Sequence, residues 1–494
     1  MMAHLPVMQV MVPLLAAPLC ALVRNGRVAW GIAVASSWAA FWIAWEIFQV
    51  VHSTGAISYS LGGWSASEGG IEYRIDTLGT FVLMVVTLVG AVVTPYALES
   101  VGKEVDKSKQ ALFYAAFLLC LAGLLGIVVT GDMFNVFVFL EISSLSAYAL
   151  IALGKDRRAL RASYQYLIMG SVGATFIVIG IGMLYVMTGS LNMANLAILL
   201  PELSSNRTIP VAFAFLTVGV CLKLALFPLH MWLPNAYTFA PSAVTAFIAS
   251  TATKVAIYVL LRLFYTVFGS DYSFLEMQLG TYLLPLSLIA IFSMSLVAIF
   301  QANVKRMLAY SSLAQIGYII LGISLFSSTG MTASILHLFN HAVIKGCLFM
   351  ALGCVMYRLN SVELDDMMGL GKKMPLTMGA FLVGGFGLIG VPFTAGFISK
   401  WYLIQGALEK GLWPVAVLVL LTSLMAVVYI WKVVETVYFS EDPGSVNSDC
   451  SEAPIGLLIP TWTLAILCVY FGIDATLTTF GASSAVANLM GIGS

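Results

Sequence analysis

Long apolar segments alternate with short polar segments along almost the whole chain. A helix that crosses a bilayer needs about 20 mostly apolar residues. On that basis the pattern predicts an all-α polytopic membrane protein with about fourteen spanning helices and no extramembrane catalytic domain. The predicted helices cover roughly residues 6–23, 29–51, 77–98, 111–129, 133–153, 162–188, 209–232, 241–267, 281–301, 307–327, 332–357, 376–405, 413–439 and 455–473.

Two of these helices, the seventh and the twelfth, contain an expected break. Pro228 interrupts the seventh near Lys223, and the Gly390–Pro392 segment interrupts the twelfth before Lys400. Proline cannot continue a helical hydrogen-bond ladder. Five helices separate the breaks, and this odd offset inverts the second unit relative to the first. Paired broken helices in inverted halves are typical of transporter sites.

This pattern divides the chain into four predicted parts. The longest connection, 52–76, has alternating residues that favour a small hairpin on the outer face. The parts are 1–110 (helices one to three), 111–270 (first five-helix repeat), 280–440 (second, inverted five-helix repeat) and 455–494 (helix fourteen and tail).

Composition strengthens the membrane assignment. The chain is 60% hydrophobic and only 9% charged, with 23 basic and 23 acidic residues, so its net charge does not point to a nucleic-acid partner. Seven scattered cysteines form no C-x-x-C pair, which leaves no zinc or iron–sulfur spacing. We therefore expect no cofactor. The N-terminal segment lacks the basic start of a signal peptide and is interpreted as a first spanning helix.

Basic residues gather in alternate loops and predict the orientation, because cytoplasmic loops are enriched in lysine and arginine. The opposite loops hold only Arg74, Arg207 and Lys410. We expect both termini outside, in a multi-pass protein of the cell inner (plasma) membrane. The basic-rich loops hold Arg24, Arg27, Lys103, Lys107, Lys109, Lys155, Arg157, Arg158, Arg161, Lys305, Arg306, Arg358, Lys372 and Lys373.

Glu141 is an acid in the middle of a predicted helix, where it needs a cationic or hydrated partner. Lys223, beside the first break, is the natural candidate. One interpretation is a static ion pair between helices. The other is a functional pair, because a buried ammonium that loses its carboxylate releases its proton more readily.

His337, His341 and Lys345 recur at i, i+4 and i+8, on one face of a helix. Two histidines at this spacing can bind a metal, but no carboxylate or cysteine nearby completes a set. Core histidines bonded to backbone are an alternative. The favoured interpretation is a proton relay, since histidine titrates near neutral pH.

Other ionisable groups extend the candidate path. Lys254 is flanked by hydroxyls and is interpreted as a relay rather than an anchor, and Lys400 follows a break whose freed carbonyls can meet a cation. We expect Lys400 to be the terminal donor toward the outer side. His230, at i+7 from Lys223, either links that lysine to the centre or bonds the broken helix. The remaining groups are Lys432 and Glu435, which either pair or act in transport, and Glu46 and Arg262, which lie near helix ends and are expected to snorkel.

Several segments together resemble the antiporter-like subunits of respiratory complex I and of Mrp-type multisubunit Na+/H+ antiporters. The likeness covers roughly residues 75–440 and, in length and in the sequence of the fifth helix, lies nearest to the D-type Mrp subunit or its relative in membrane-bound hydrogenases. The segments are GDMFNVFVFLEISSLSAYALIALG, KLALFPLHMWLPNAYTFAPSAVTAFIASTATKVAIYVLLR, VKRMLAYSSLAQIGYIILG, HLFNHAVIKGCLFM and GVPFTAGFISKW.

The resemblance implies fourteen helices with two inverted five-helix bundles, helices four to eight and nine to thirteen, around a hydrophilic axis. It implies that Glu141 and Lys223 are the coupling pair and Lys254 the bridging lysine. His337 and Lys345 would then be the relay and Lys400 the exit. The chain lacks the long lateral helix of the largest complex I antiporter subunit and the C-terminal domains of the A-type Mrp subunit.

We therefore expect a proton-translocating subunit of a Mrp-type Na+/H+ antiporter, which acts with other membrane subunits in the lipid bilayer. The alternative is a proton-pumping subunit of a redox-driven complex, either complex I or a membrane-bound hydrogenase. Both use the same residues, because the coupling chemistry belongs to partner subunits. A membrane scaffold with degenerate charges is a third possibility, and the intact Glu141, Lys223 and Lys400 argue against it.

Overall fold

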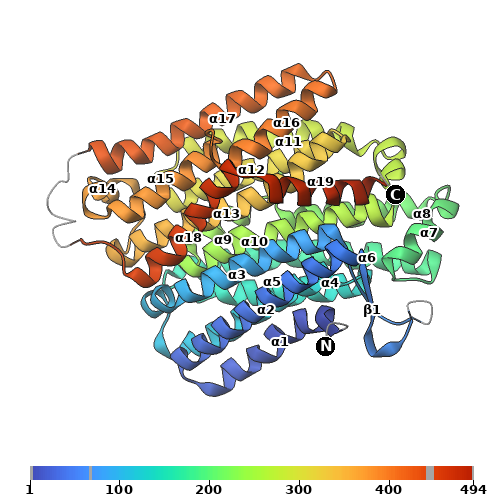
Figure 1. Ribbon diagram of the computed structural model, residues 1–494, viewed down its shortest axis with the longest axis horizontal. Coiled ribbons are helices and arrows are strands. Elements are labelled where there is room, and N and C mark those ends of the chain that lie inside the picture. The colour runs from blue at the N-terminus through green and yellow to red at the C-terminus, as the bar shows by residue number, and fades with distance from the viewer. Residues whose placement is uncertain (1–3, 66–68, 441–449, 492–494) are drawn as a thin grey trace.

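The computed structural model describes residues 4–65, 69–440 and 450–491. These residues form a bundle of long helices that run roughly side by side (Figure 1). The α-helices are α1 (Leu5–Val23), α2 (Gly26–Thr54), α3 (Thr77–Glu104), α4 (Gln110–Val129), α5 (Met133–Ala152), α6 (Arg157–Thr188), α7 (Met193–Leu203), α8 (Thr208–Leu224), α9 (Leu233–Phe239), α10 (Ser242–Leu261), α11 (Leu279–Ile299), α12 (Val304–Ser324), α13 (Ser328–Leu359), α14 (Leu370–Lys373), α15 (Pro375–Ile389), α16 (Ala395–Glu409), α17 (Trp413–Val434), α18 (Ile455–Ile473) and α19 (Thr476–Met490).

Among the described residues, twelve helices are long and apolar enough to cross a membrane. The two predicted spans missing from these twelve are the broken ones. In the first, predicted over 209–232, α8 ends at Leu224 and α9 begins only after the predicted span. The second consists of α15 and α16, and each of these helices is too short to qualify alone. The predicted all-α polytopic class is confirmed, and the fourteen crossings and the inverted repeats stay predictions.

The predicted hairpin in 52–76 is confirmed. Strand β1 (Ile57–Ser60) pairs antiparallel with β2 (Glu72–Ile75), with Ile57 opposite Ile75. Four short α-helices, α7, α9, α14 and α19, were not predicted, and α7 and α19 are the longest of them. The eleven residues of α7 are fewer than a span needs, and α19 is rich in threonine, serine and small residues, so neither stands out as an apolar segment.

The two ends of the bundle differ. The start of α1 lies against the hairpin, since His4 bonds the Tyr59 hydroxyl at 2.9 Å, and the end of α19 reaches the same end of the molecule (Figure 1). We call this end the hairpin face. At the opposite end, the basic face, Lys155 donates to the Lys103 carbonyl at 2.7 Å. The start of α1 and the end of α19 therefore lie at the hairpin face, and which face is outside stays a prediction.

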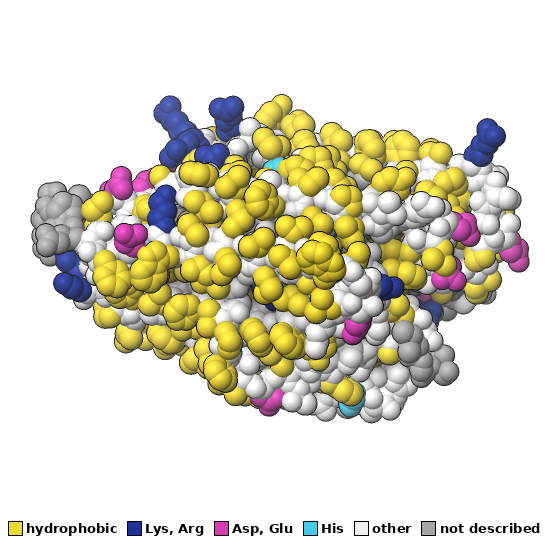
Figure 2. All heavy atoms as spheres, turned by 90° about the horizontal axis from the view of Figure 1, so that it is seen from above, with side chains coloured by type: hydrophobic (Ala, Val, Ile, Leu, Met, Phe, Trp, Pro, Cys, Tyr) yellow, Lys and Arg dark blue, Asp and Glu magenta, His cyan; other side chains and the backbone are white. Residues whose placement is uncertain are grey.

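Helices α10, α12 and α13 form the centre of the bundle, and nearly every one of their residues is buried. Small residues let α10 and α13 pack closely, as is usual in membrane interfaces. A Cβ on Gly346 would lie 3.1 Å from the Ser250 hydroxyl, and one on Gly353 would lie 2.8 Å from the Ser242 Cβ. On the outside of the bundle, apolar side chains cover most of the face in Figure 2, and charged ones lie mainly toward its ends.

Candidate functional site

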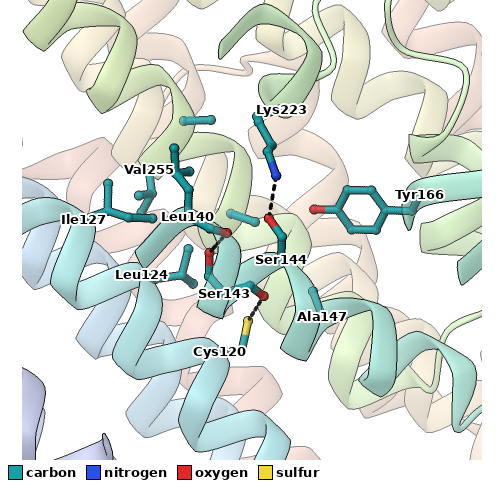
Figure 3. A pocket seen from close by; sticks show the side chains of 12 residues that line it. Cys120, Leu124, Ile127, Leu140, Ser143, Ser144, Ala147, Tyr166, Lys223 and Val255 are labelled. Atoms are coloured by element: carbon teal, nitrogen blue, oxygen red, sulfur yellow. Dashed lines mark hydrogen bonds between the residues drawn. The ribbon is translucent and has the colours of Figure 1, made fainter. Parts of the chain in front are cut away.

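Glu141 of α5 and Lys223 of α8 form the ion pair that the sequence predicted. The Lys223 ammonium donates to Glu141 Oε1 at 2.9 Å. It also donates to the Ser144 hydroxyl at 3.0 Å (Figure 3). The Lys223 side chain is 4% exposed, whereas the Glu141 side chain is 26% exposed. The lysine is therefore the deeply buried member, and its charge depends on these two partners.

The break in the seventh predicted helix holds Lys223 in place. Helix α8 ends at Leu224, one residue beyond the lysine, and Ala225 turns the chain in the left-handed region with φ 60°. The chain resumes a helix only at Leu233. The Trp232 indole donates to the Leu222 carbonyl at 3.1 Å, which satisfies an acceptor freed by the break. Lys223 is thus fixed in the last turn of a helix that ends inside the protein.

A small cavity lies beside this pair. Its volume is about 20 Å³, which is room for a single water molecule. Figure 3 shows the Lys223 ammonium and the Tyr166 hydroxyl both directed toward Ser144. Ala252 and Val255 of α10 line the other side of the cavity. The cavity therefore separates the ion pair from the helix that carries the next lysine.

Lys254 lies in the middle of α10 and is 0% exposed. Its ammonium donates to the Ala249 carbonyl at 2.5 Å. Of the neighbouring hydroxyls that were expected to bond it, Thr251 donates to the Phe247 carbonyl, and the Ser250 hydroxyl has no protein partner. A buried polar atom without a protein partner indicates a position for ordered water.

His337 is held between two side chains. Its Nδ1 lies 2.8 Å from the Ser399 hydroxyl and its Nε2 lies 2.9 Å from Gln315 Oε1. His341 stacks on it with ring centroids 6.0 Å apart, and both His341 nitrogens are buried without a protein partner. These orphaned nitrogens mark a second position that suits water.

Lys345 continues the row on α13. Its ammonium donates to the Leu308 carbonyl of α12 at 2.8 Å and also to the Ser311 hydroxyl. Lys254 exerts an electrostatic interaction on His337, His341 and Lys345, so the four groups share one region at the α10–α13 contact.

Lys400 lies at the break between α15 and α16, where the sequence predicted freed carbonyls. Its ammonium donates to the Leu388 and Ile389 carbonyls at 3.1 and 2.9 Å, which confirms that expectation. It also lies 4.9 Å from the Tyr318 ring centroid, and Tyr318 packs edge-on against His337. Lys400 and His337 therefore share a neighbour.

Two expectations about side-chain geometry are wrong. His230 does not share a helical face with Lys223, because α8 ends at Leu224 and the i+7 periodicity stops there. The His230 ring stacks on Phe227, with its Nδ1 buried and unpaired.

Lys432 and Glu435 do not form one of the ion pairs in the described part of the chain. The Lys432 ammonium instead donates to carbonyls at the end of α11, at 3.3 and 3.4 Å.

Sequence reasoning also missed two buried cations. Arg262 does not snorkel, and its guanidinium makes a two-pronged ion pair with Asp76, the N-cap residue of α3. Burial raises the pKa of the Asp76 carboxyl, but the neighbouring Arg262 outweighs this and leaves that pKa below its ordinary value. Lys305 is buried at the start of α12 rather than in a loop, and donates to the Ala240 carbonyl at 2.6 Å.

A metal site has no geometric support in the described residues. No group of three or more histidine, cysteine, aspartate or glutamate side chains lies close enough together there to hold an ion. The two His337 nitrogens face a hydroxyl and an amide oxygen rather than further ligands.

Comparisons with known proteins agree with this arrangement. A family model described as "NADH:quinone oxidoreductase/Mrp antiporter, TM" matches residues 130–426. NADH-quinone oxidoreductase subunit N of Desulforudis audaxviator is 39% identical over 96% of each chain. The D-type subunit of the Na(+)/H(+) antiporter of Bacillus subtilis is 30% identical over 96% of this chain and 94% of the relative. A chain of the membrane-bound sulfane sulfur reductase, an archaeal respiratory membrane complex, superposes with a TM-score of 0.89 at 32% identity, over 99% of this chain and 98% of that one.

Proposed function

The chain belongs to the family of transmembrane subunits shared by NADH:quinone oxidoreductases and Mrp antiporters, and on this premise we propose that it translocates protons as one subunit of a multisubunit membrane complex. The first candidate is a Mrp-type Na+/H+ antiporter. The 30% identity to a D-type antiporter subunit over nearly the full length supports it.

The observation that carries the proposal is the Glu141–Lys223 ion pair beside a helix break. A carboxylate 2.9 Å from a buried ammonium stabilises the charged form of the lysine. When the carboxylate moves away, the ammonium is left in a site with one hydroxyl partner, and it releases its proton. A structural pair needs no cavity, whereas this pair adjoins one large enough for a water molecule that receives the proton.

From this pair we propose a path through Lys254, the His337–His341–Lys345 cluster and Lys400. The orphaned Ser250 and His341 atoms support water positions between these residues, and the Lys400 carbonyl partners support a cation held at a break. His230, Lys432 and Glu435 belong to the path only as secondary members, since none of them contacts its main groups in the described structure.

The organisation of the chain follows the same proposal. Residues 111–270 and 280–440 would be two inverted units, each with one broken helix, preceded by 1–110 and followed by 455–494. The start of α1 and the end of α19 lie at the hairpin face, and the excess of basic residues at the other face supports a cytoplasmic basic face in the plasma membrane.

A redox-driven complex is the second candidate. The 39% identity to an NADH-quinone oxidoreductase subunit N, and the 32% identity to a chain of a respiratory sulfur reductase, favour it. In that case the same row of residues would move protons, and the driving reaction would take place in other subunits.

Proton flux in vesicles tests the proposal. Inside-out membrane vesicles that contain the chain with its native partner subunits should lose proton flux when Lys223→Ala is introduced, while assembly of the complex persists. Lys109→Ala, at the exposed Lys109–Asp106 ion pair between α3 and α4, is the matched control and should retain flux. Wild-type flux in Lys223→Ala would overturn the proposal. Flux driven by a Na+ gradient indicates an antiporter, and flux driven only by electron transfer indicates the redox complex.

A further inference from the structure

Helix α10 carries a line of polar side chains through the centre of the protein. Ser250, Lys254 and Tyr258 in α10, and Arg262 in the π-helical turn Arg262–Val267 that continues it, recur at every fourth position, so they lie close to one helical face. All four are buried, and the Ser250 hydroxyl has no protein partner. A helix in the core of a membrane protein has no structural need for such a line, because buried polar groups there are costly.

A polar cavity opens at each end of this helix. At the hairpin face, a cavity of about 340 Å³ is lined by Arg74, Asp76, Tyr258, Arg262 and Thr266, with α19 contributing Asn488. At the basic face, a cavity of about 650 Å³ reaches Ala240 and Pro241, directly before α10 begins. Its lining includes the charged side chains of Lys103, Glu104, Lys155, Asp156, Arg158 and Lys305.

The hairpin-face cavity ends on an ion pair. The Arg262 side chain is 8% exposed and the Asp76 side chain 15% exposed. Besides its two bonds to Asp76, the guanidinium donates from Nε to the Tyr258 hydroxyl at 3.0 Å. That hydroxyl donates in turn to the Val128 carbonyl at 2.8 Å. One turn of α10 then separates Tyr258 from Lys254. The pair and Tyr258 therefore lie together where the polar cavity approaches the central lysine.

We propose that one part of the ion route in this chain runs along α10. The hairpin-face cavity is the mouth of this route, and the Asp76–Arg262 pair is the gate between that mouth and Lys254. The inference rests on the proposed function and adds an outlet that is separate from Lys400. An arginine stays charged, so the gate opens by movement of the pair rather than by loss of the arginine proton. The Tyr258 hydroxyl is the group that relays a proton past it.

The basic-face end has a matching arrangement. Glu104 of α3 accepts from the Ser242 amide at 2.9 Å and from its hydroxyl at 3.1 Å, at the first residue of α10. The Lys305 ammonium donates to the carbonyl of Ala240, two residues before Ser242. Both charged side chains line the larger cavity, so each end of α10 lies at a polar cavity.

Cysteine accessibility in the assembled complex tests the gate. Ser250→Cys places a thiol beneath the gate and Thr266→Cys places one in the mouth. A membrane-impermeant methanethiosulfonate ammonium reagent, applied from the hairpin face, should modify Thr266→Cys and leave Ser250→Cys unmodified. Adding Asp76→Asn with Arg262→Gln, which removes both charges together, should then expose Ser250→Cys to the reagent. The parent chain is the control, since six of its seven cysteines are buried.

Tyr258→Phe provides a second test of the gate, because this substitution removes only the hydroxyl proposed to relay the proton. We expect it to reduce proton flux while assembly and the Asp76–Arg262 pair persist. Unchanged reactivity of Ser250→Cys in the double variant, or wild-type flux in Tyr258→Phe, would overturn the gate. If the gate is overturned in this way but Lys223→Ala still abolishes proton flux in the same vesicles, the proposed function stands without the gate.

Discussion

The two members of the Glu141–Lys223 pair differ in burial. Single and double substitutions can therefore distinguish a structural role of the pair from a role in transport. Glu141→Gln leaves a 4% exposed ammonium without its carboxylate, whereas Lys223→Met leaves a carboxylate whose side chain is 26% exposed. Removing one partner of a buried pair costs about 3–5 kcal/mol, because the remaining charge is uncompensated. We expect the lower end, about 3 kcal/mol, for Glu141→Gln, since the amide oxygen keeps the hydrogen bond.

The opposite single variant should be milder. The Glu141 carboxylate is the less buried of the two charges, so the loss of its partner in Lys223→Met should cost less, about 1 kcal/mol. The double variant has no buried charge left, and neutral replacement of a buried pair is often stability-neutral or better. Its stability should therefore return close to wild type, although neither the single variants nor the double variant should translocate protons.

The assay has two readouts on the same preparations. Thermal unfolding of the purified complex reports the stability of each variant, and proton uptake by vesicles reports its function. Recovered stability with absent flux supports a pair that acts in transport. Recovered flux in the double variant would refute the reasoning, because the pair would then be only a structural contact. Equal losses of stability in both single variants would refute the assignment of the buried charge to Lys223.

Three further outcomes follow from the geometry. Lys400→Ala should assemble normally but lose proton flux, because the carbonyls at the α15–α16 break lose their cation; unchanged flux would leave Lys400 as a packing residue. Gln315→Leu should lower flux in vesicles without loss of assembly, since it removes one of the two partners that orient His337, and a wild-type rate would contradict that orienting role. Gly353→Ala should lower stability by about 1–3 kcal/mol in thermal unfolding, because its Cβ would overlap the Tyr96 hydroxyl. Adding Tyr96→Phe should restore part of this loss. If no stability is recovered, the clash does not involve the Tyr96 hydroxyl.

Hydropathy and helix breakers predicted much of the fold. The apolar segments mark the spanning helices, and Pro228 and Gly390 indicate which two are interrupted, because each removes or weakens a local hydrogen bond. The boundaries inside these segments depend on tertiary contacts. Helix α8 ends at Leu224 rather than at Pro228 because the chain turns at Ala225, and no local signal in the sequence marks that turn.

The candidate site was predictable where charge alone decides the outcome. A glutamate and a lysine at bilayer depth must find partners, and the Glu141–Lys223 contact follows from that requirement. Arg262 was misjudged because its partner Asp76 lies 186 positions away and caps another helix, a contact that spacing cannot reveal. Lys305 was assigned to a loop because basic residues between apolar segments usually lie at the membrane surface.

Lys254 belongs to both proposed routes, the path from Lys223 to Lys400 and the route along α10. Its removal therefore tests the central claim most directly. The measurement is proton flux through the purified complex in vesicles, with Lys254→Met compared with wild type at equal assembly. Methionine keeps the length of the side chain and removes its charge and its proton. The account predicts that flux is abolished. Flux at the wild-type rate would contradict it, because protons would then cross the membrane without using the buried charges of this chain.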